Sequence, residues 1–175
     1  SISGHKIQGP TGIGALVVRR NRFAHRRLKP IIHGGSQEFG LRPGTPSIAL
    51  AAGLSLAARL TQQNASLHWS TCLEKKRRFL ALLDGLPHTV VGNIDSTLPH
   101  CISLTLHGVD AEAIFVAANH MFAISNGSAC TSSGVSSSHV LSAIGLSEDD
   151  LSSTVRISWS SDTPDSVFEE IAKTV

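Results

Sequence analysis

Cysteine is scarce in this chain of 175 residues, which has only three, Cys72, Cys101 and Cys130. None of them forms a Cys-x-x-Cys pair, and a sparse, odd-numbered set argues against both a disulfide framework and a structural zinc site. No two histidines have a spacing that demands a metal ion. We therefore expect no metal centre, and a reducing compartment of cytoplasmic type.

The chain also lacks long apolar runs and a strong net charge. No stretch of about 18 apolar residues occurs, so the sequence predicts no membrane-spanning helix. The formal charge of +2 is too close to neutral to predict direct binding of nucleic acid. The arginine cluster at 19–27 fits a solvated loop, or a stretch that binds phosphate or nucleic acid. The first residues contain neither an initiator methionine nor a secretory signal, which is typical of the middle of a longer protein.

What is present is the composition of a folded, soluble protein, 41% hydrophobic with 15 glycines and 7 prolines. Strands alternating with helices predict an α/β or α+β unit. The apolar run at 14–18 predicts a buried strand, and Asn64 is the expected N-cap between two helices. The expected strands are 14–18, 88–91, 101–106, 122–125 and 155–159, and the expected helices are 47–63, 65–83, 110–119, 138–145 and one beginning at Pro164. Period-2 spacing predicts one shared face for Ile102, Leu104 and Leu106, and the polar stretch 126–137 predicts a loop. The expected helix ends are Gly85 as a stop and Asp110 and Ser138 as starts.

Cys130 is the cysteine whose surroundings favour reactivity. It lies in Asn126-Gly127-Ser128-Ala129-Cys130-Thr131-Ser132-Ser133-Gly134, and such small polar residues cannot pack a core. The thiol is therefore expected to be exposed, whereas Cys72 falls in a helical run and Cys101 opens an apolar strand. An inert loop cysteine is the other interpretation, and a Cys130–His139 pair is weak evidence for a base.

Two cationic residues are further candidates. Lys6 stands beside His5, three residues after Ser3, and before a glycine-rich turn. Hydroxyl and imidazole groups there could hold a phosphate while the amine engages a carbonyl, although an exposed loop lysine has the same local sequence. Arg156 lies inside the apolar strand 155–159, where its guanidinium either binds an anion such as a carboxylate or points outward.

Four segments together resemble the NifS/IscS-like cysteine desulfurases, of the class V aminotransferase group. They are Ser3-Gly4-His5-Lys6-Ile7-Gln8-Gly9-Pro10-Thr11-Gly12-Ile13-Gly14, the loop Gly34-Gly35-Ser36-Gln37-Glu38 with Gly40-Leu41-Arg42-Pro43-Gly44-Thr45, the loop around Cys130, and Val155-Arg156-Ile157-Ser158. The resemblance covers nearly the whole chain. It departs from the family at Ser36, Phe39 and Pro43, where glycine, arginine and serine are commoner.

The resemblance implies the α/β architecture of the pyridoxal-phosphate-dependent transferases of fold type I. The chain would be the C-terminal half of such a protein, with the end of the large cofactor-binding domain in residues 1–60. The smaller C-terminal α+β domain would occupy residues 61–175. Members of the family are roughly twice as long, and much of the cofactor pocket lies in the part upstream of the lysine.

The same resemblance implies a role for each candidate. Lys6 would attach pyridoxal 5'-phosphate covalently, and Ser3 and His5 would bind its phosphate. Thr45 would reach the phosphate of the neighbouring subunit's cofactor, which implies a homodimer. Arg156 would hold the carboxylate of L-cysteine. Cys130 would take the sulfur as a persulfide, leaving L-alanine, and pass it to a sulfur-acceptor or scaffold protein.

Other functions stay open at this point. The chain could belong to a class V aminotransferase acting on another amino acid, or be a sulfur-relay module that never binds cofactor. A cysteine hydrolase using Cys130 and His139 would leave Lys6, Thr45 and Arg156 unexplained. The destination of the sulfur also stays open among iron–sulfur clusters, thiolated tRNA and sulfur-modified DNA.

Overall fold

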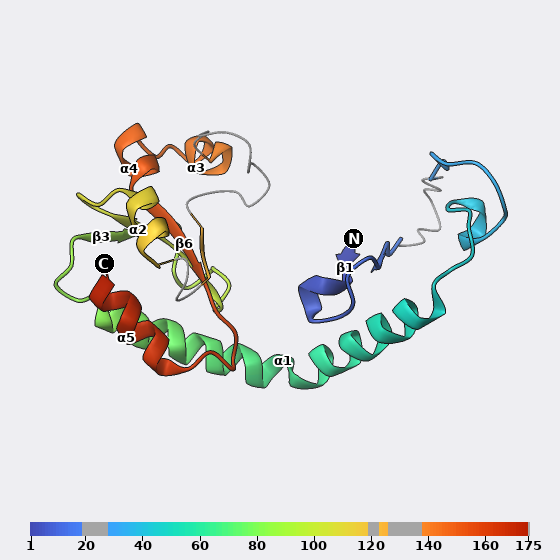
Figure 1. The fold of residues 1–175 in the computed structure, drawn as a ribbon, viewed down its shortest axis with the longest axis horizontal. Helices are drawn as coiled ribbons and strands as arrows, with labels where there is room; N and C mark the ends of the chain where they lie inside the picture. Colours follow the sequence, from blue (N-terminus) through green and yellow to red (C-terminus); the bar gives the residue numbers. More distant parts are fainter. Residues whose placement is uncertain (19–27, 119–122, 126–137, 175) are drawn as a thin grey trace. The chain divides into compact units, whose positions relative to one another are not determined.

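The computed structural model describes residues 1–18, 28–118, 123–125 and 138–174. The chain divides into two compact units, Ser1–Ala65 and Ser66–Val175. Helix α1, Ile48–Leu82, contributes to both of them (Figure 1). Assigning 1–60 to a large domain and 61–175 to a small one stays a prediction, because compactness alone does not say to which domain of a longer protein a unit belongs.

The first unit is built mostly of turns. Strand β1, Ile2–Ser3, pairs antiparallel with β2, Gly14–Ala15, and the 3-10 helix η1, Gly4–Ile7, lies between them. A second 3-10 helix, η2, Glu38–Gly40, precedes α1. The prediction of a buried strand over 14–18 is wrong, since the strand has two residues and the side chains at 16–18 are 49% to 74% exposed. Its partner β1 also has only two residues, too few to extend the pairing.

Helix α1 replaces the two helices predicted for 47–63 and 65–83. The expected break at Asn64 does not occur, because its side-chain amide donates a hydrogen bond to the carbonyl of Leu60 at 3.0 Å, within the helix. Asparagine is only a modest helix breaker, and neither glycine nor proline stands near it. The predicted stop is confirmed, since the helix ends at Leu82 and Gly85 has φ +90°.

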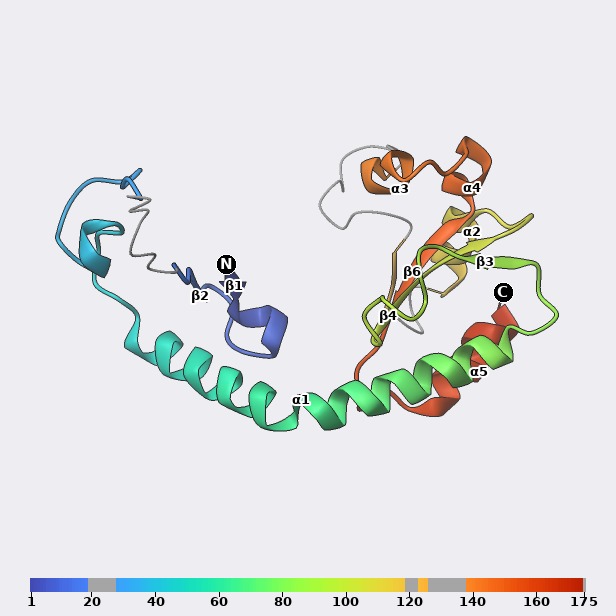
Figure 2. The same ribbon diagram turned by 180° about the vertical axis from the view of Figure 1, so that it is seen from behind.

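The second unit contains an antiparallel sheet of order β3-β4-β6-β5, and three helices pack their apolar side chains against one face of it. Figures 1 and 2 show α5 running beside the C-terminal part of α1. The strands are β3 (His88–Val90), β4 (Cys101–Leu106), β5 (Ile124–Ser125) and β6 (Thr154–Ser158), and the helices are α2 (Ala111–Ala118), α3 (His139–Ala143), α4 (Glu148–Ser152) and α5 (Asp165–Thr174). Most of the predicted strands and helices of this unit are confirmed within one to three residues.

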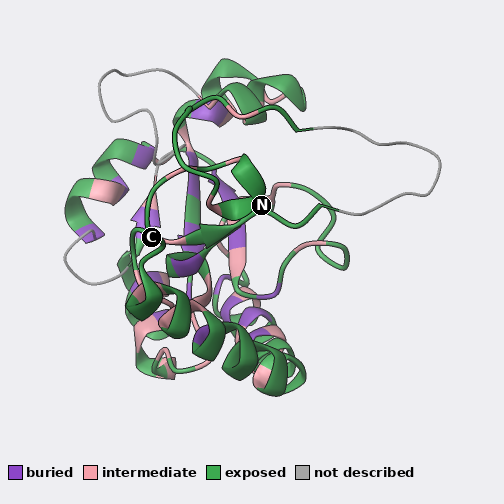
Figure 3. Cartoon of the chain, turned by 90° about the vertical axis from the view of Figure 1, so that its right-hand side faces the viewer, coloured by how far each residue is buried: buried purple, intermediate pink, exposed green. Residues whose placement is uncertain are grey.

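The core of this unit lies between the sheet and helices α1, α2 and α5. Ile102, Leu104 and Leu106 alternate along β4 and are at most 3% exposed, as their period-2 spacing predicts. Figure 3 shows buried residues along the strands and the facing helices. Aromatic packing joins Phe79 of α1 to Phe168 of α5, with ring centroids 5.5 Å apart. Burial of this apolar surface is the main stabilising contribution to the unit.

Capping side chains determine where the short helices begin. The Asp110 carboxylate accepts from the backbone N–H groups of Glu112 and Ala113, as predicted for α2. Helix α4 was not predicted, although Ser147 accepts from the N–H of Asp150 at 3.1 Å and Ser-Glu-Asp-Asp is a recognisable helix start.

Among the described residues, no helix is long and apolar enough to cross a membrane.

Candidate cofactor and catalytic site

Lys6 lies on a turn closed around Gly4. The N–H of Gly4 donates to the carbonyl of Ile13 at 2.9 Å, and the N–H of Gly9 donates to the carbonyl of Gly4 at 2.9 Å. Gly4 is buried, and a methyl group on its Cα would lie 2.7 Å from the carbonyl oxygen of Pro10. Only glycine fits there, so the sequence Ser-Gly-His-Lys folds this turn around a residue without a side chain.

The turn leaves three polar side chains exposed, those of Ser3, His5 and Lys6. Ser3 stands at the N-cap of η1, yet its hydroxyl makes no capping hydrogen bond. Within the described residues, no carboxylate pairs with the Lys6 amine. An amine, an imidazole and a hydroxyl on one turn are suitable groups for an aldehyde that also carries a phosphate, so this set fits pyridoxal phosphate.

Lys76 is a lysine of the opposite kind. Its side chain is 2% exposed, and its amine is held by the Thr97 hydroxyl at 2.5 Å and the Leu98 carbonyl at 3.3 Å. Burial lowers the pKa of this amine from its usual range, and the charges of Cys101 and Asp95 raise it by less. Lys76 therefore joins α1 to the segment before β4 through hydrogen bonds, and its amine is not available to a cofactor.

Thr45 follows a loop with demanding backbone geometry. Glu38 and Phe39 both have positive φ, at 49° and 61°, and Gly44 has φ +100°. The side-chain oxygen of Gln37 accepts from the N–H of Gly44 at 3.1 Å, which closes the loop just before Thr45. Thr45 is exposed and belongs to the same compact unit as Lys6.

Arg156 lies on the face of the sheet opposite to helices α1, α2 and α5. Its neighbours Val155 and Ile157 are buried in the core, and Arg156 is exposed. Its cross-strand partners are Ser103 on β4 and Ser125 on β5, so two hydroxyl side chains flank it on this face. The sequence left open whether Arg156 points outward, and the structure shows it exposed; the two serine neighbours required the register of strands distant in the sequence.

The candidates are thus divided between the two units. Ser3, His5 and Lys6 share one turn of the first unit with Thr45 elsewhere in it, and Arg156 belongs to the second unit. Cys130 and the predicted loop at 126–137 lie outside the described residues. The roles given to all six residues stay predictions.

The other two cysteines have different environments. Cys72 is 5% exposed, and burial raises the pKa of its thiol, which keeps it protonated and inert as its helical position predicted. Cys101 is partly exposed, and its sulfur accepts from the Ser158 hydroxyl at 3.6 Å. In the part of the chain that the structure describes, no group of histidine, cysteine and acidic side chains is arranged to hold a metal ion.

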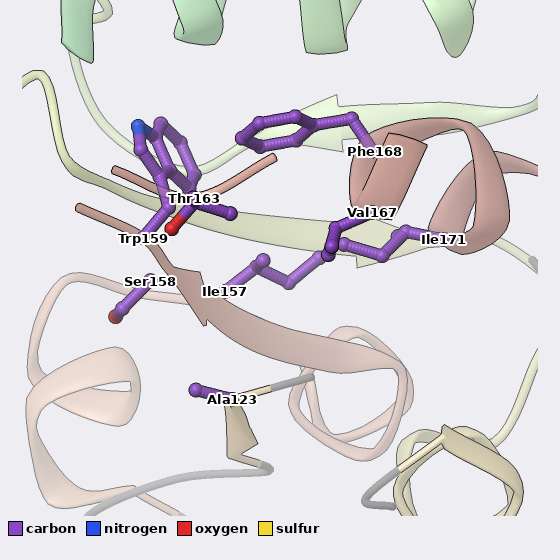
Figure 4. A pocket seen from close by; sticks show the side chains of 8 residues that line it. All are labelled: Ala123, Ile157, Ser158, Trp159, Thr163, Val167, Phe168 and Ile171. Carbon is purple, nitrogen blue, oxygen red and sulfur yellow. The ribbon is translucent and has the colours of Figure 1, made fainter. Parts of the chain in front are cut away.

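A pocket of about 210 Å³ lies between β6 and α5. Figure 4 shows Trp159 and Phe168 on one side of it and Ile157 on another. Its lining is mainly apolar, and none of the predicted site residues that the structure describes contributes to it. It offers no charged group to a cofactor phosphate or a substrate carboxylate, so it is not the candidate site.

Comparison with known proteins places these residues in a family context. The model of the family described as aminotransferase class-V matches residues 1–166. The chain is 42% identical over 159 residues to a mitochondrial cysteine desulfurase of Drosophila melanogaster, covering 89% of this chain and 34% of that protein. The chain therefore spans about a third of the length of this relative.

Solved structures agree on the fold. A NifS-like protein superposes with a TM-score of 0.81 at 22% identity, over 98% of this chain and 43% of the other. DndA from Streptomyces lividans superposes with a TM-score of 0.73 at 36% identity, over 91% of this chain and 45% of the other. The predicted α/β fold of the pyridoxal-phosphate-dependent fold type I proteins is confirmed.

The predicted cytoplasmic location is contradicted by the names of the relatives found by sequence similarity. The eukaryotic relatives from Schizosaccharomyces pombe, Drosophila melanogaster, Arthroderma benhamiae and Trachipleistophora hominis are named mitochondrial or mitosomal. Sparse cysteines indicate a reducing environment, but they do not distinguish the cytoplasm from other reducing compartments of the cell.

Proposed function

Because the chain belongs to the aminotransferase class-V family, we propose that it carries the cofactor-lysine and cysteine-loop part of a cysteine desulfurase that uses pyridoxal phosphate. The observation that carries the proposal is the turn around Gly4, which presents the side chains of Ser3, His5 and Lys6 together and exposed. The relatives named cysteine desulfurases support the sulfur chemistry.

Four residues would hold the cofactor. The Lys6 amine would bind it covalently, the Ser3 hydroxyl and the His5 imidazole would bind its phosphate, and Thr45 would bind the phosphate at the neighbouring site of a homodimer. When bound, the cofactor withdraws electrons from the substrate carbon. The Lys6 amine, when not bonded to the cofactor, would carry a proton to or from that carbon.

Arg156 and Cys130 would act on the substrate, L-cysteine. The Arg156 guanidinium would bind the carboxylate through paired hydrogen bonds, and the flanking Ser103 hydroxyl supports a polar surface there. The Cys130 thiolate would attack the substrate sulfur, so that an S–S bond forms as the C–S bond breaks. The electron pair of the broken bond would pass to the substrate β-carbon, which would take up the proton that Cys130 lost on becoming a thiolate. The products would be L-alanine and a Cys130 persulfide for an acceptor protein.

Product analysis tests this proposal. We expect the complete protein, incubated with pyridoxal phosphate, L-cysteine and a thiol reductant, to release equimolar L-alanine and sulfide. Lys6→Ala and Cys130→Ser should each abolish both products. The exposed Lys29→Ala and the partly exposed Cys101→Ser are matched controls that should retain activity.

Two other outcomes would redirect the assignment. Cofactor binding without sulfide release would favour an aminotransferase for another amino acid. No cofactor binding by the complete protein would refute the role of Lys6. Sulfur loaded onto Cys130 by a separate desulfurase would then identify a relay module.

A further inference from the structure

One face of α1 receives the turn that carries Lys6. Leu50, Gly53 and Ala57 are spaced i, i+3 and i+7, so they share one side of the helix. Gly12, Pro10 and Gly9 of the turn face these three positions in the reverse order along the chain. This contact lies within the first compact unit, and Ala57 is one of its few buried side chains, 8% exposed.

The contact leaves no room for added atoms at Gly53. A methyl group on its Cα would lie 2.5 Å from Cγ and 3.1 Å from Cδ of Pro10, against about 3.5–4.0 Å for an ordinary carbon–carbon contact. A methyl group on Gly9 would lie 3.1 Å from the Cβ of Ala57. A glycine inside a helix is less stabilising than an alanine. The close approach of Pro10 is a physical reason for having glycine at position 53.

Pro10 and Gly9 are coupled to the lysine through the closed turn. The Gly9 N–H donates to the Gly4 carbonyl at 2.9 Å, and Lys6 lies between these two residues. The carbonyl oxygen of Pro10 also lies against Gly4, where no side chain can be accommodated. Moving Pro10 away from α1 must therefore shift the turn and the Lys6 amine with it.

We propose that Gly53 and Pro10 are positioning residues for Lys6. The contact of Pro10 with α1 at Gly53 would fix the place where the lysine amine meets the cofactor. The inference rests on the proposed function, and it adds residues that contact neither cofactor nor substrate. A displacement of about 1 Å at a reacting group is enough to cost about 100-fold in rate. The overlap at Gly53 is of that size.

A pair of substitutions and their combination test the contact. Gly53→Ala adds the overlapping methyl group, and Pro10→Ala removes Cγ and Cδ, leaving a Cβ that would lie 4.0 Å from the new methyl group. The double variant therefore restores an ordinary contact. Ala52→Leu, on an exposed position of the same helix, is the matched control for added bulk.

Three readouts would be measured on the complete protein loaded with pyridoxal phosphate. They are the pH midpoint of the absorbance of lysine-bound cofactor, the split between kcat and KM for L-cysteine, and the melting temperature. We expect Gly53→Ala to shift the pH midpoint and lower kcat about 100-fold. KM should change much less, Ala52→Leu should match the unsubstituted protein, and the double variant should return to the values of Pro10→Ala.

The outcomes separate this inference from the proposed function. If Lys6→Ala does not change the bound-cofactor absorbance, the proposed function fails. If the cofactor is attached to Lys6 but Gly53→Ala leaves the pH midpoint and kcat unchanged, the positioning role is refuted. A double variant that keeps the values of Gly53→Ala, where these differ from those of Pro10→Ala, refutes it too. Should Gly53→Ala fail to fold, Pro10→Ala alone decides, because a freed turn must shift the pH midpoint.

Discussion

The two units of this protein are stabilised in different ways. Among the described residues of the first unit, only Gly4 and Ala57 are buried, and its turns are fixed by backbone hydrogen bonds and close contacts. The second unit buries an apolar core between a sheet and three helices. The first unit thus depends on glycines at close contacts, and the second depends on apolar side chains that pack together.

Two phenylalanines, one in each unit, differ most in their exposure to solvent. Phe79 is fully buried between Trp159 and Phe168, and Phe39 is 95% exposed. We expect Phe79→Ala to lower the free energy of unfolding of the second unit by about 3–5 kcal/mol, because it removes a buried ring and leaves a cavity. Phe39→Ala, the matched control, should change stability by less than about 0.5 kcal/mol.

Hydrogen exchange resolved by peptide measures both changes in the complete protein. Phe79→Ala should raise exchange in β4, β6 and α5, and leave the turn around Gly4 at its original rate. Equal loss of protection in both units would show that they unfold together and would remove the contrast.

A polar contact inside the second unit gives the next largest effect. The hydroxyls of Thr105 and Thr154 are 2.8 Å apart and buried, and the Thr154 hydroxyl also donates to the Asp150 carbonyl at 2.6 Å. Thr154→Val keeps the shape and leaves the buried Thr105 hydroxyl without its partner, so we expect a loss of about 1–3 kcal/mol in denaturant unfolding. Thr174→Val removes an exposed hydroxyl and should be nearly neutral, and a neutral Thr154→Val would contradict the assignment.

The smallest expected effect concerns the ion pairs that join α1 to α5. The Lys75 amine lies 3.0 Å from the Asp165 carboxylate, which also pairs with Arg78. The hydrogen bond from Lys75 has the largest effect on the pKa of Asp165 and lowers it below its ordinary 3.8. Burial, the next largest, raises this pKa, and the charges of Lys75 and Arg78 lower it further. Because the folded pKa is depressed, the stabilisation is complete above pH 3.8 and lost as the pH falls through the folded pKa.

Unfolding followed as a function of pH checks this sign. The stability difference between the unsubstituted protein and Asp165→Asn should be present at neutral pH and vanish in the acid range below 3.8. It should also shrink as salt is added, because the group is partly exposed. Asp84→Asn, at an exposed position, serves as the control, and a difference that persisted in acid would contradict the ion-pair explanation.

Local patterns in the sequence were enough for much of the second unit. Period-2 alternation in 101–106 predicted the buried face of β4, and Asp110, Ser138 and Gly85 marked helix ends that the structure confirms. These signals act over a few residues, so they need no knowledge of what packs against them. The strand predicted at 14–18 failed because its burial depends on a neighbouring surface that local pattern does not contain.

The sequence by itself determined the family and the candidate residues, because Lys6, Thr45, Cys130 and Arg156 stand in motifs read along the chain. It left open whether Arg156 points outward from β6, and the structure shows this side chain exposed. The tertiary structure alone decided the rest: the continuity of α1, the burial of Lys76, and the seating of Pro10 against Gly53. Each of these depends on atoms brought together from distant positions, and only folding fixes such distances.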